Sequence, residues 1–514
     1  MSEILIGQSY FQRFDPKVWE AREPYPPLGS LYAASYLREN GHDVALFDAV
    51  LARSEGEWET AIARERPRLA VLYEDNFNYL SKMCLLRMRQ AAFTMVQMAR
   101  RRGCTVIVCG ADASDHAAEY LKAGAGFVLQ GEGEYTLLEL TNKLSGRNSV
   151  PYEQIPGLVF VPEGASTPIF TPRRPDIRDL DSLPFPAWDL VEVERYRKIW
   201  RWHHGYFSMN LVSTRGCPFH CNWCAKPIWG QRYNSRSPEN VAAEMKWLKM
   251  NHQPDHIWFA DDIFGLKPGW IERFAECVEK MDCRIPFKSL SRVDLLQRPG
   301  EIEMLKRAGC RIVWVGAESG SQKILDAMEK GTRVEQIYET RRRLREAGIQ
   351  VGFFLQFGYP GETREDIEKT LQMVRDCHPD EIGMSVSYPL PGTKFYEAVR
   401  QQLGAKQNWD DSNDLAMLYR GPYGTGFYRQ LHRVLHREFR ARKHWNELGS
   451  LTRREDRPRW KHFKHAASLA YAAVALPVER RRLKRLECEQ QRSLAIIPQL
   501  THAQAAVPSP QDTP

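Results

Sequence analysis

The chain reads STRGCPFHCNWC from Ser213 to Cys224, which places three of its 11 cysteines within a few residues. Cys217, Cys221 and Cys224 follow the spacing Cys-x3-Cys-x2-Cys. Short spacers let three thiolates point at one centre, and thiolates are the ligands that hold iron–sulfur clusters. The spacing therefore predicts a [4Fe–4S] cluster in which three protein ligands leave one iron open to a substrate.

A structural zinc site is the nearest alternative for these cysteines. Such a site needs a fourth ligand and is usually built from paired Cys-x2-Cys knuckles. His220 lies between the first two cysteines, where it is poorly placed to complete the same site. The remaining cysteines are scattered, and we expect them to be small buried residues rather than a disulfide framework.

Residues 206–400 alternate between apolar strands and helical stretches, and the cysteines follow the first strand. Six strand–helix units of this length predict a partial TIM-type barrel, whose chemistry takes place at the carboxyl ends of its strands. The expected strands are Ser208–Val212, His256–Phe259, Phe287–Leu290, Ile312–Val315, Val351–Phe357 and Gly383–Ser387.

The cysteine spacing and its place after the first barrel strand resemble the radical S-adenosylmethionine (SAM) superfamily. The resemblance implies that the methionine amino and carboxylate groups chelate the open iron, and that reductive cleavage yields a 5′-deoxyadenosyl radical. It also implies that the first loop and the later strand ends bind SAM. The implied residues are Trp223 near the adenine, Asp261 and Asp262 near the methionine amine, Arg292 at the methionine carboxylate, Glu318 and Ser319 at the nucleoside or methionine, and Gly358, Pro360 and Gly361 along the adenosine.

These strand-end residues also have purely structural alternatives. Carboxylates can accept hydrogen bonds from an ammonium group, but the Asp261–Asp262 pair could equally cap the helix that starts near Pro268. Arg292 could form an ordinary ion pair at the barrel rim. The glycines and serines could simply shape turns.

Residues 1–145 form a second alternating segment, with strands expected at Ile4–Gly7, Val44–Phe47, Leu69–Tyr73, Val106–Cys109 and Phe127–Gln130. Strands separated by helices predict an α/β domain with a doubly wound parallel sheet, and ligands of such sheets bind at the carboxyl ends of the strands. Residues 146–205 are rich in proline and predict a linker with some short strands.

A parallel sheet that precedes a radical SAM barrel resembles the cobalamin-binding domain of the B12-dependent radical enzymes. The resemblance rests on five pieces: Tyr25–Leu31, Gly41–Val44, Phe47–Ala49, Cys109–Asp112 and Leu129–Glu134. It implies that cobalamin is a further cofactor. The residues implied to contact it are Pro27, Leu28, Gly29, Asp48, Gly110, Gly131 and Glu132.

Two positions depart from the pattern of that domain. Many of its members carry Asp-x-His-x-x-Gly, whose histidine ligates cobalt from below, whereas Asp48 is followed by Ala49-Val50-Leu51-Ala52. The sequence Gly110-Ala111-Asp112 stands where Gly-Gly-Pro-His is frequent, and His116 a few residues later is expected to be a surface residue. The lower cobalt face is therefore expected to be unligated or covered by side chains such as those of Tyr73–Phe77.

The leading functional hypothesis is a cobalamin-dependent methyltransferase that acts on an unactivated carbon. A B12-dependent cyclase or oxidoreductase that transfers no methyl group, similar to the anaerobic Mg-protoporphyrin ester cyclase, is the first alternative. A non-catalytic iron–sulfur accessory protein is another. A methylthiotransferase is a further alternative, which would require a second set of cysteines in the N-terminal domain. Cys84, Cys104 and Cys109 do not form a clear set, which disfavours it.

The remaining features concern the C-terminal region and the partners. The chain has 514 residues and a net charge of +8, lacks a signal-peptide pattern at its start, and is expected to be cytoplasmic. Residues 401–490 are expected to be helical and basic, and residues 491–514 disordered. The basic, aromatic stretch from Arg429 to Arg485 predicts either a packing subdomain with a solvated face or peripheral contact with an anionic membrane. The expected partners are a small-molecule or lipid substrate and a reducing electron donor such as flavodoxin or ferredoxin, with no nucleic acid.

Overall fold

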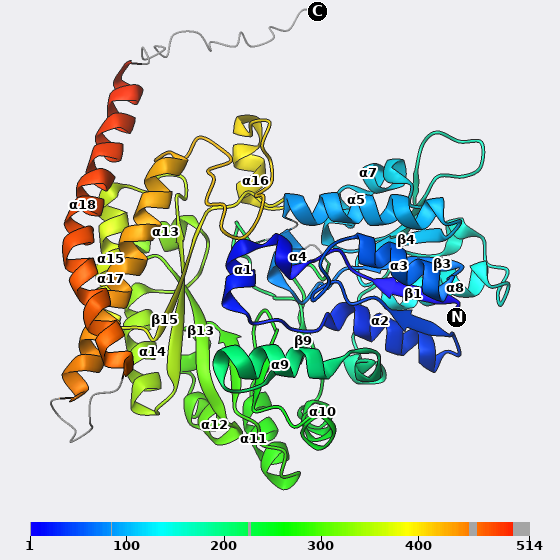
Figure 1. Ribbon diagram of the computed structural model, residues 1–514, viewed down its shortest axis with the longest axis horizontal. Coiled ribbons are helices and arrows are strands. Elements are labelled where there is room, and N and C mark those ends of the chain that lie inside the picture. The colour runs from blue at the N-terminus through cyan, green and yellow to red at the C-terminus, as the bar shows by residue number, and fades with distance from the viewer. Residues whose placement is uncertain (1, 84, 225–227, 452–459, 497–514) are drawn as a thin grey trace, which may run out of the picture. The chain divides into compact units, whose positions relative to one another are not determined.

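The computed structural model describes residues 2–83, 85–224, 228–451 and 460–496 (Figure 1). The chain divides into two compact units at Arg420. The N-terminal sheet, the Pro-rich segment and the barrel, which the sequence distinguishes as three regions, all belong to the first unit.

The first unit begins with a seven-stranded sheet, here sheet A, in the order β2-β1-β3-β4-β5-β6-β7. Its first five strands are parallel, as the sequence predicted. The Pro-rich segment adds β6 and β7 as antiparallel edge strands, so part of the expected linker belongs to the sheet. The strands are β1 (Ile4–Gly7), β2 (Val44–Leu46), β3 (Leu69–Tyr73), β4 (Thr105–Cys109), β5 (Phe127–Leu129), β6 (Leu158–Phe160) and β7 (Ile169–Phe170).

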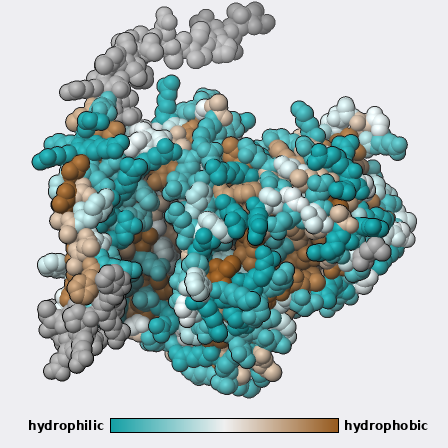
Figure 2. Space-filling model, in the orientation of Figure 1, coloured by the Kyte–Doolittle hydropathy of each residue, from teal (hydrophilic) through white to brown (hydrophobic). Residues whose placement is uncertain are grey.

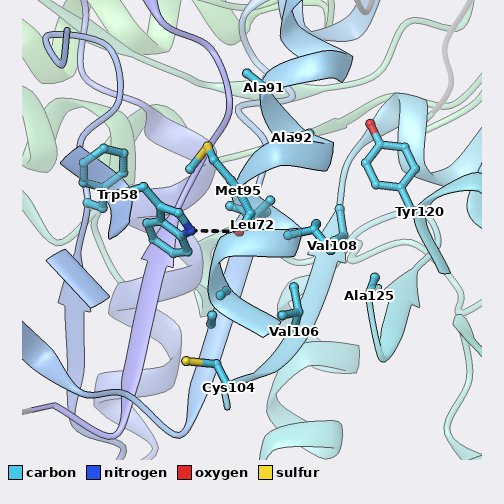
Figure 3. Close-up of a cluster of buried hydrophobic side chains, with 14 of the residues drawn as sticks. Trp58, Leu72, Ala91, Ala92, Met95, Cys104, Val106, Val108, Tyr120 and Ala125 are labelled. Carbon is cyan, nitrogen blue, oxygen red and sulfur yellow. Dashed lines mark hydrogen bonds between the residues drawn. The ribbon is translucent and has the colours of Figure 1, made fainter. Parts of the chain in front are cut away.

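Helices cover both faces of sheet A, which gives the doubly wound arrangement. One face packs against α3 (Gly56–Glu65), α5 (Leu86–Arg101) and α7 (Ala117–Ala123), and the other against α2 (Leu28–Glu39) and α8 (Glu134–Leu144). The side chains of the first face are shown in Figure 3, where the buried indole of Trp58 donates a hydrogen bond of 3.1 Å to the Met95 carbonyl oxygen. Short helices α1 (Pro16–Ala21), α4 (Tyr79–Met83) and α6 (Ala111–Asp115) lie in the loops.

The second sheet of this unit, sheet B, has six parallel strands in the order β15-β14-β13-β12-β11-β8. This sequential order, with a helix after each strand, is the partial barrel that the sequence predicted. The strands are β8 (Ser208–Leu211), β11 (His256–Phe259), β12 (Phe287–Ser291), β13 (Cys310–Glu318), β14 (Gln350–Phe357) and β15 (Glu381–Val386). The helices are α10 (Pro238–Asn251), α11 (Trp270–Lys280), α12 (Glu301–Ala308), α13 (Gln322–Ala327), α14 (Val334–Glu346), α15 (Arg364–Cys377) and α16 (Lys394–Val399), and α9 (Val193–His204) precedes the sheet.

The second unit consists of two long helices, α17 (Thr425–Leu451) and α18 (Trp460–Ile496). Helix α18 includes the first residues of the expected disordered tail, and residues 497–514 lie outside the described residues. Several large side chains of α18, such as Tyr471 and Val474, are exposed. Figure 2 shows hydrophobic surface, in brown, along this helix at the left edge of the view. Within the described ranges, every helix is too short or too polar to cross a membrane.

Candidate functional site

The three cysteines lie on a loop between β9 (Thr214–Arg215) and β10 (Asn234–Ser235), two short strands that pair antiparallel and close the base of the loop. Cys221 is buried, Cys217 and Cys224 are partly buried, and none of the three forms a disulfide. Gly216 directly precedes them with φ +83°, and a Cβ there would lie 2.3 Å from the Arg232 carbonyl oxygen. Only glycine therefore fits the backbone at this point.

Asn222 anchors the middle of the cysteine loop to the barrel. Its amide N–H donates to the Met328 carbonyl oxygen at 3.1 Å, and its side-chain Nδ2 donates to the Ala327 carbonyl oxygen at 2.7 Å. The Tyr359 hydroxyl, from the end of β14, donates to Asn222 Oδ1 at 2.8 Å. These bonds fix the segment that carries Cys221, Trp223 and Cys224, and sequence reasoning did not identify Asn222.

Asp261, at the end of β11, holds the segment that leads into the loop. Its Oδ1 accepts the backbone N–H groups of Ser213 at 2.7 Å and Thr214 at 2.9 Å, and its Oδ2 accepts the Ser213 hydroxyl. Burial raises the pKa of the Asp261 carboxyl to about 6. Both oxygens accept hydrogen bonds from protein donors, so Asp261 shapes the segment that leads into the loop. The role near the methionine amine that the resemblance implied stays a prediction.

Arg292 and Glu318 come from the next two strand ends and lie beside the cysteines. The Arg292 guanidinium stacks over the Phe219 ring at 3.7 Å, places Nη1 3.9 Å from Cys221 Sγ, and pairs with Asp294 at 3.0 Å. Glu318 accepts a hydrogen bond of 2.8 Å from the buried Lys330 ammonium and has φ +56°, a backbone region that is uncommon for a non-glycine residue. Arg292 thus forms the ion pair at the barrel rim that was one alternative, and it also lies close to a cysteine of the loop.

Lys330 is a second residue that sequence reasoning did not identify. Its ammonium lies 6.0 Å from the Trp223 ring centroid and donates to Glu318 Oε1 at 2.8 Å. Burial opposes its charge, but the Glu318 carboxylate and Cys221 outweigh this and hold the pKa of the ammonium above its ordinary value. The lysine therefore brings a positive charge next to the loop.

The other predicted barrel residues differ in burial. Ser319 is buried and its hydroxyl lies 3.1 Å from that of Thr370. The Gly358 N–H donates to Glu362 Oε2 at 2.7 Å, and its carbonyl oxygen accepts the Tyr419 hydroxyl. Pro360 and Gly361 are exposed on the following turn.

In sheet A, the predicted residues gather where the parallel strands end. The order β2-β1-β3-β4-β5 reverses direction between β1 and β3, which is where ligands of doubly wound sheets bind. The Gly29 N–H donates to Asp75 Oδ1 at 3.1 Å, and Cβ atoms at Gly29 and Gly110 would both meet Glu74 at 3.0 Å or less. Pro27 and Leu28 are buried just before and at the start of α2.

Asp48 follows β2 and contacts the segment between the two sheets. Its carboxylate accepts the Tyr196 hydroxyl of α9 at 2.6 Å and the Val50 N–H at 3.1 Å. Burial raises the pKa of this carboxyl to about 6. The apolar residues that replace the family histidine segment, Ala49–Ala52, are buried, and Tyr196 was not expected from the sequence.

Glu74, at the end of β3, gives a prediction about pH. Its carboxylate accepts the Ser9 N–H, and burial raises its pKa from 4.5 to about 7. Because the folded-state pKa is raised, its contribution to stability is complete below pH 4.5 and is lost as the pH rises through about 7. The loss is about 3 kcal/mol at about 1.4 kcal/mol per pKa unit.

Glu74→Gln should therefore flatten the decline in the free energy of unfolding between about pH 5 and pH 7.5 relative to the unchanged chain. Urea unfolding at several pH values measures this difference. Asp48 and Asp261, whose pKa values burial also raises to about 6, are not among the charges that act on Glu74 and are expected to contribute equally to both proteins. Parallel pH profiles for the two proteins would rule out ionisation of Glu74 in this range.

Three buried or half-buried ion pairs join the sheet A side to the barrel. Arg215, directly before the cysteine loop, donates to Glu132 at 3.0 Å and to Glu134 at 2.7 Å, and all three side chains are buried. Lys82 of α4 donates to Asp262 Oδ1 at 2.6 Å. Glu132, which takes part in this contact, follows Gly131, whose backbone has φ +75°.

Aromatic side chains extend the contact between the two sheets. The Lys82 ammonium lies 5.0 Å from the Trp229 ring centroid, and Trp229 stacks on Phe77 at 5.2 Å. Tyr79 of α4 remains 55% exposed, but protein crowding around its hydroxyl, together with Cys224 and Glu318, raises its pKa. Tyr79 thus extends from the sheet A side toward the predicted cluster and SAM residues.

The structure describes two of the three cysteines considered for a second set, and these lie at opposite ends of one strand. Cys104 and Cys109 are buried at either end of β4 in sheet A, and burial raises the pKa of both thiols. Cys84 lies outside the described residues.

Residues 211–374, from the end of β8 through α15, match the family model of the Radical SAM superfamily. The chain carries a radical SAM domain. The resemblance predicted from the cysteine spacing and the strand ends is thereby confirmed. This domain includes the cysteine loop, Asp261, Arg292, Glu318 and Gly358.

Comparisons extend beyond the radical SAM domain. An uncharacterized methyltransferase of Pyrococcus horikoshii is 27% identical over 399 residues, which cover 75% of this chain and 81% of the relative. The anaerobic magnesium-protoporphyrin IX monomethyl ester cyclase of Rubrivivax gelatinosus is 29% identical over 287 residues, which cover 54% of this chain and 49% of the cyclase.

Among solved structures, the radical SAM methyltransferase TsrM of Kitasatospora setae, with cobalamin and a [4Fe–4S] cluster bound, superposes with a TM-score of 0.62. The match has 20% identity and covers 78% of this chain and 75% of TsrM. The predicted fold, a doubly wound sheet followed by a partial barrel, is thus shared with a solved radical SAM enzyme.

Proposed function

We propose that the chain is a cobalamin-dependent radical SAM enzyme that methylates an unactivated carbon of a small molecule. The observation that carries the proposal is the pair of contacts Arg215–Glu132 and Lys82–Asp262. Each pair joins a residue beside the predicted corrinoid edge of sheet A to one beside the predicted cluster and SAM residues. The two cofactor regions therefore adjoin within one compact unit.

The cysteine loop fits an iron–sulfur cluster with one open position. Three thiols lie on a loop that β9, β10, Asn222 and Asp261 hold in place, and one of them is buried next to the Arg292 cation. A nearby positive charge favours the thiolate form that binds iron. When bound, the cluster supplies the electron that cleaves SAM. We assign Cys217, Cys221 and Cys224 as its ligands.

The barrel residues fit the polar ends of SAM. Arg292 provides a guanidinium suited to a carboxylate, and the Glu318 and Asp262 carboxylates suit an ammonium group. Each carboxylate forms an ion pair with a lysine in this structure, Glu318 with Lys330 and Asp262 with Lys82. We assign Trp223, Ser319, Gly358, Pro360 and Gly361 to the surrounding adenosine contacts.

The strand ends of sheet A fit a flat corrinoid. Gly29 lies against the Glu74 backbone and Gly110 against the Glu74 side chain, so neither position has room for a side chain, and Gly131 adopts a left-handed conformation. When bound, cobalamin supplies the methyl group. We assign Pro27, Leu28, Gly29, Asp48, Gly110, Gly131 and Glu132 to this edge. The loop after β2 has Ala49-Val50-Leu51-Ala52 where the family histidine would stand, so this loop would supply no ligand to cobalt.

The relatives support methyl transfer, and one of them also supports a reaction without methyl transfer. The Pyrococcus relative is named a methyltransferase and covers most of this chain, which favours the same reaction here. The match to the anaerobic cyclase favours a second candidate, a B12-dependent ring-forming oxidation without methyl transfer. In either case a reducing donor such as flavodoxin or ferredoxin would supply the electron, and peripheral membrane contact stays a prediction.

The products distinguish these candidates. After anaerobic reconstitution with iron, sulfide, cobalamin and SAM, a methyltransferase forms both 5′-deoxyadenosine and S-adenosylhomocysteine from SAM when a substrate is present. The cyclase alternative forms 5′-deoxyadenosine without S-adenosylhomocysteine, and a non-catalytic accessory protein forms neither. Liquid chromatography with mass detection measures both, and a protein lacking bound corrinoid would overturn the proposal.

A further inference from the structure

The two helices of the second unit run antiparallel and are joined by polar contacts along their length. Gln430 Nε2 donates to the Glu479 carbonyl oxygen at 3.2 Å, and Arg437 pairs with the Glu479 carboxylate at 2.9 Å. The Arg480–Glu438 pair lies at 2.8 Å. Residues late in α17 therefore face residues early in α18.

At this facing end, three metal-ligating side chains converge. His444 and Glu447 lie one helical turn apart on α17, and His465 comes from α18. One ligand atom from each residue lies within 4.8 Å of the other two. His465 Nδ1 is 3.0 Å from Glu447 Oε2, and the His444 and His465 rings stack with centroids 4.3 Å apart and planes at 22°.

The His444 imidazole carries a nitrogen atom without a hydrogen bond. Its Nδ1 atom is buried from solvent and makes no hydrogen bond within the described part of the chain, whereas His465 Nδ1 faces the Glu447 carboxylate. A buried polar atom without a hydrogen bond is destabilising. A bound cation that accepts the Nδ1 lone pair of His444 would remove that cost.

The geometry of the pair suits a shared cation. The two rings lie nearly parallel, and one ligand atom of each lies close to the other and to a Glu447 carboxylate oxygen. Glu447, whose side chain is 43% exposed, supplies a negative charge on the solvent side of the pair.

We propose that His444, Glu447 and His465 form a binding site for a divalent transition-metal ion of the Zn²⁺ type, which joins α17 to α18. Two imidazole nitrogens and one carboxylate are a ligand set that zinc accepts, with water as the fourth ligand. The imidazoles select against Mg²⁺ and Ca²⁺, which prefer oxygen ligands. The site involves none of the cysteines and does not depend on the proposed methyl transfer.

Zinc titration of the full chain tests the site. The cysteines of the loop would compete for zinc, so all variants carry Cys217→Ser, Cys221→Ser and Cys224→Ser. Competition against a chromophoric chelator should then show one tightly bound Zn²⁺ per chain. X-ray absorption of that ion should show nitrogen and oxygen neighbours at about 2.0–2.1 Å and no sulfur.

Matched variants locate the ion. His444→Ala with His465→Ala should abolish the tight equivalent, and Glu447→Gln should weaken it. The control is His432→Ala with His436→Ala, another pair of neighbouring imidazoles, both on α17, whose centroids lie 4.2 Å apart with ring planes at 45°. The control should bind zinc as tightly as its parent. If the parent binds no Zn²⁺ tightly, or if only the control variant loses the tightly bound Zn²⁺, the proposal is overturned. Circular dichroism checks that each variant retains its helices.

Discussion

Cys221→Ala should abolish the cluster and with it all formation of 5′-deoxyadenosine from SAM. Cys221 is the buried member of the three cysteines and lies beside Arg292. A cluster held by only two thiolates lacks the ligand set that family members use. We expect the iron content and the visible absorbance of the reconstituted protein to fall to background, and product formation to fall below detection by mass spectrometry.

Cys488→Ala is the matched control for this loss, because Cys488 is an exposed cysteine of α18. The control should keep both the iron content and the activity of the unchanged chain. Equal iron in the Cys221→Ala protein and its parent would contradict the assigned ligands. A loss of iron that is the same in both variants would indicate general damage rather than loss of a ligand.

Arg215→Met should destabilise the first unit by about 3–5 kcal/mol, the usual result of removing one partner from a buried ion pair. The Glu132 and Glu134 carboxylates would stay buried without the guanidinium that now binds both. Burial opposes the charge of Arg215, but Glu134 and Glu132 outweigh it and hold the pKa of the guanidinium above its ordinary value. Urea unfolding followed by tryptophan fluorescence measures the change.

Two further variants separate this pair from a general effect of losing an arginine. Arg273→Met breaks contacts with Glu239 and Glu276 at the surface and should leave stability nearly unchanged. Adding Glu132→Gln and Glu134→Gln to Arg215→Met removes the buried charges and should restore much of the lost stability. Equal stability of the Arg215→Met and Arg273→Met proteins would mean that Arg215 does not hold the two sheets together.

The strands of both sheets could be predicted because their signals are local. Apolar runs that end in polar turns marked the six barrel strands and the five parallel strands of sheet A, and the cysteine spacing placed the loop after β8. Strands β6 and β7 are only two or three residues long in a Pro-rich segment, so periodicity could not show that they join sheet A. Their position depends on pairing with β5.

The contacts around the candidate site could be predicted only in part, because they join residues far apart in sequence. Lys82 and Asp262 are 180 residues apart, and no local pattern connects them. Asp261 was predicted from its place after a strand, but its bonds go to Ser213 and Thr214, which lie just after the neighbouring strand β8 and are 48 and 47 residues away in sequence. Asn222 lay inside the recognised motif, and its polar character between two cysteines was a signal that could have been followed.

The most direct test of the account is the metal content of the chain after anaerobic reconstitution with iron, sulfide and cobalamin, followed by gel filtration. The account predicts that cobalt elutes with the protein in a one-to-one ratio and that iron elutes with it at the level of one [4Fe–4S] cluster per chain. Iron without cobalt would contradict the claim that sheet A and the barrel bring two cofactors together.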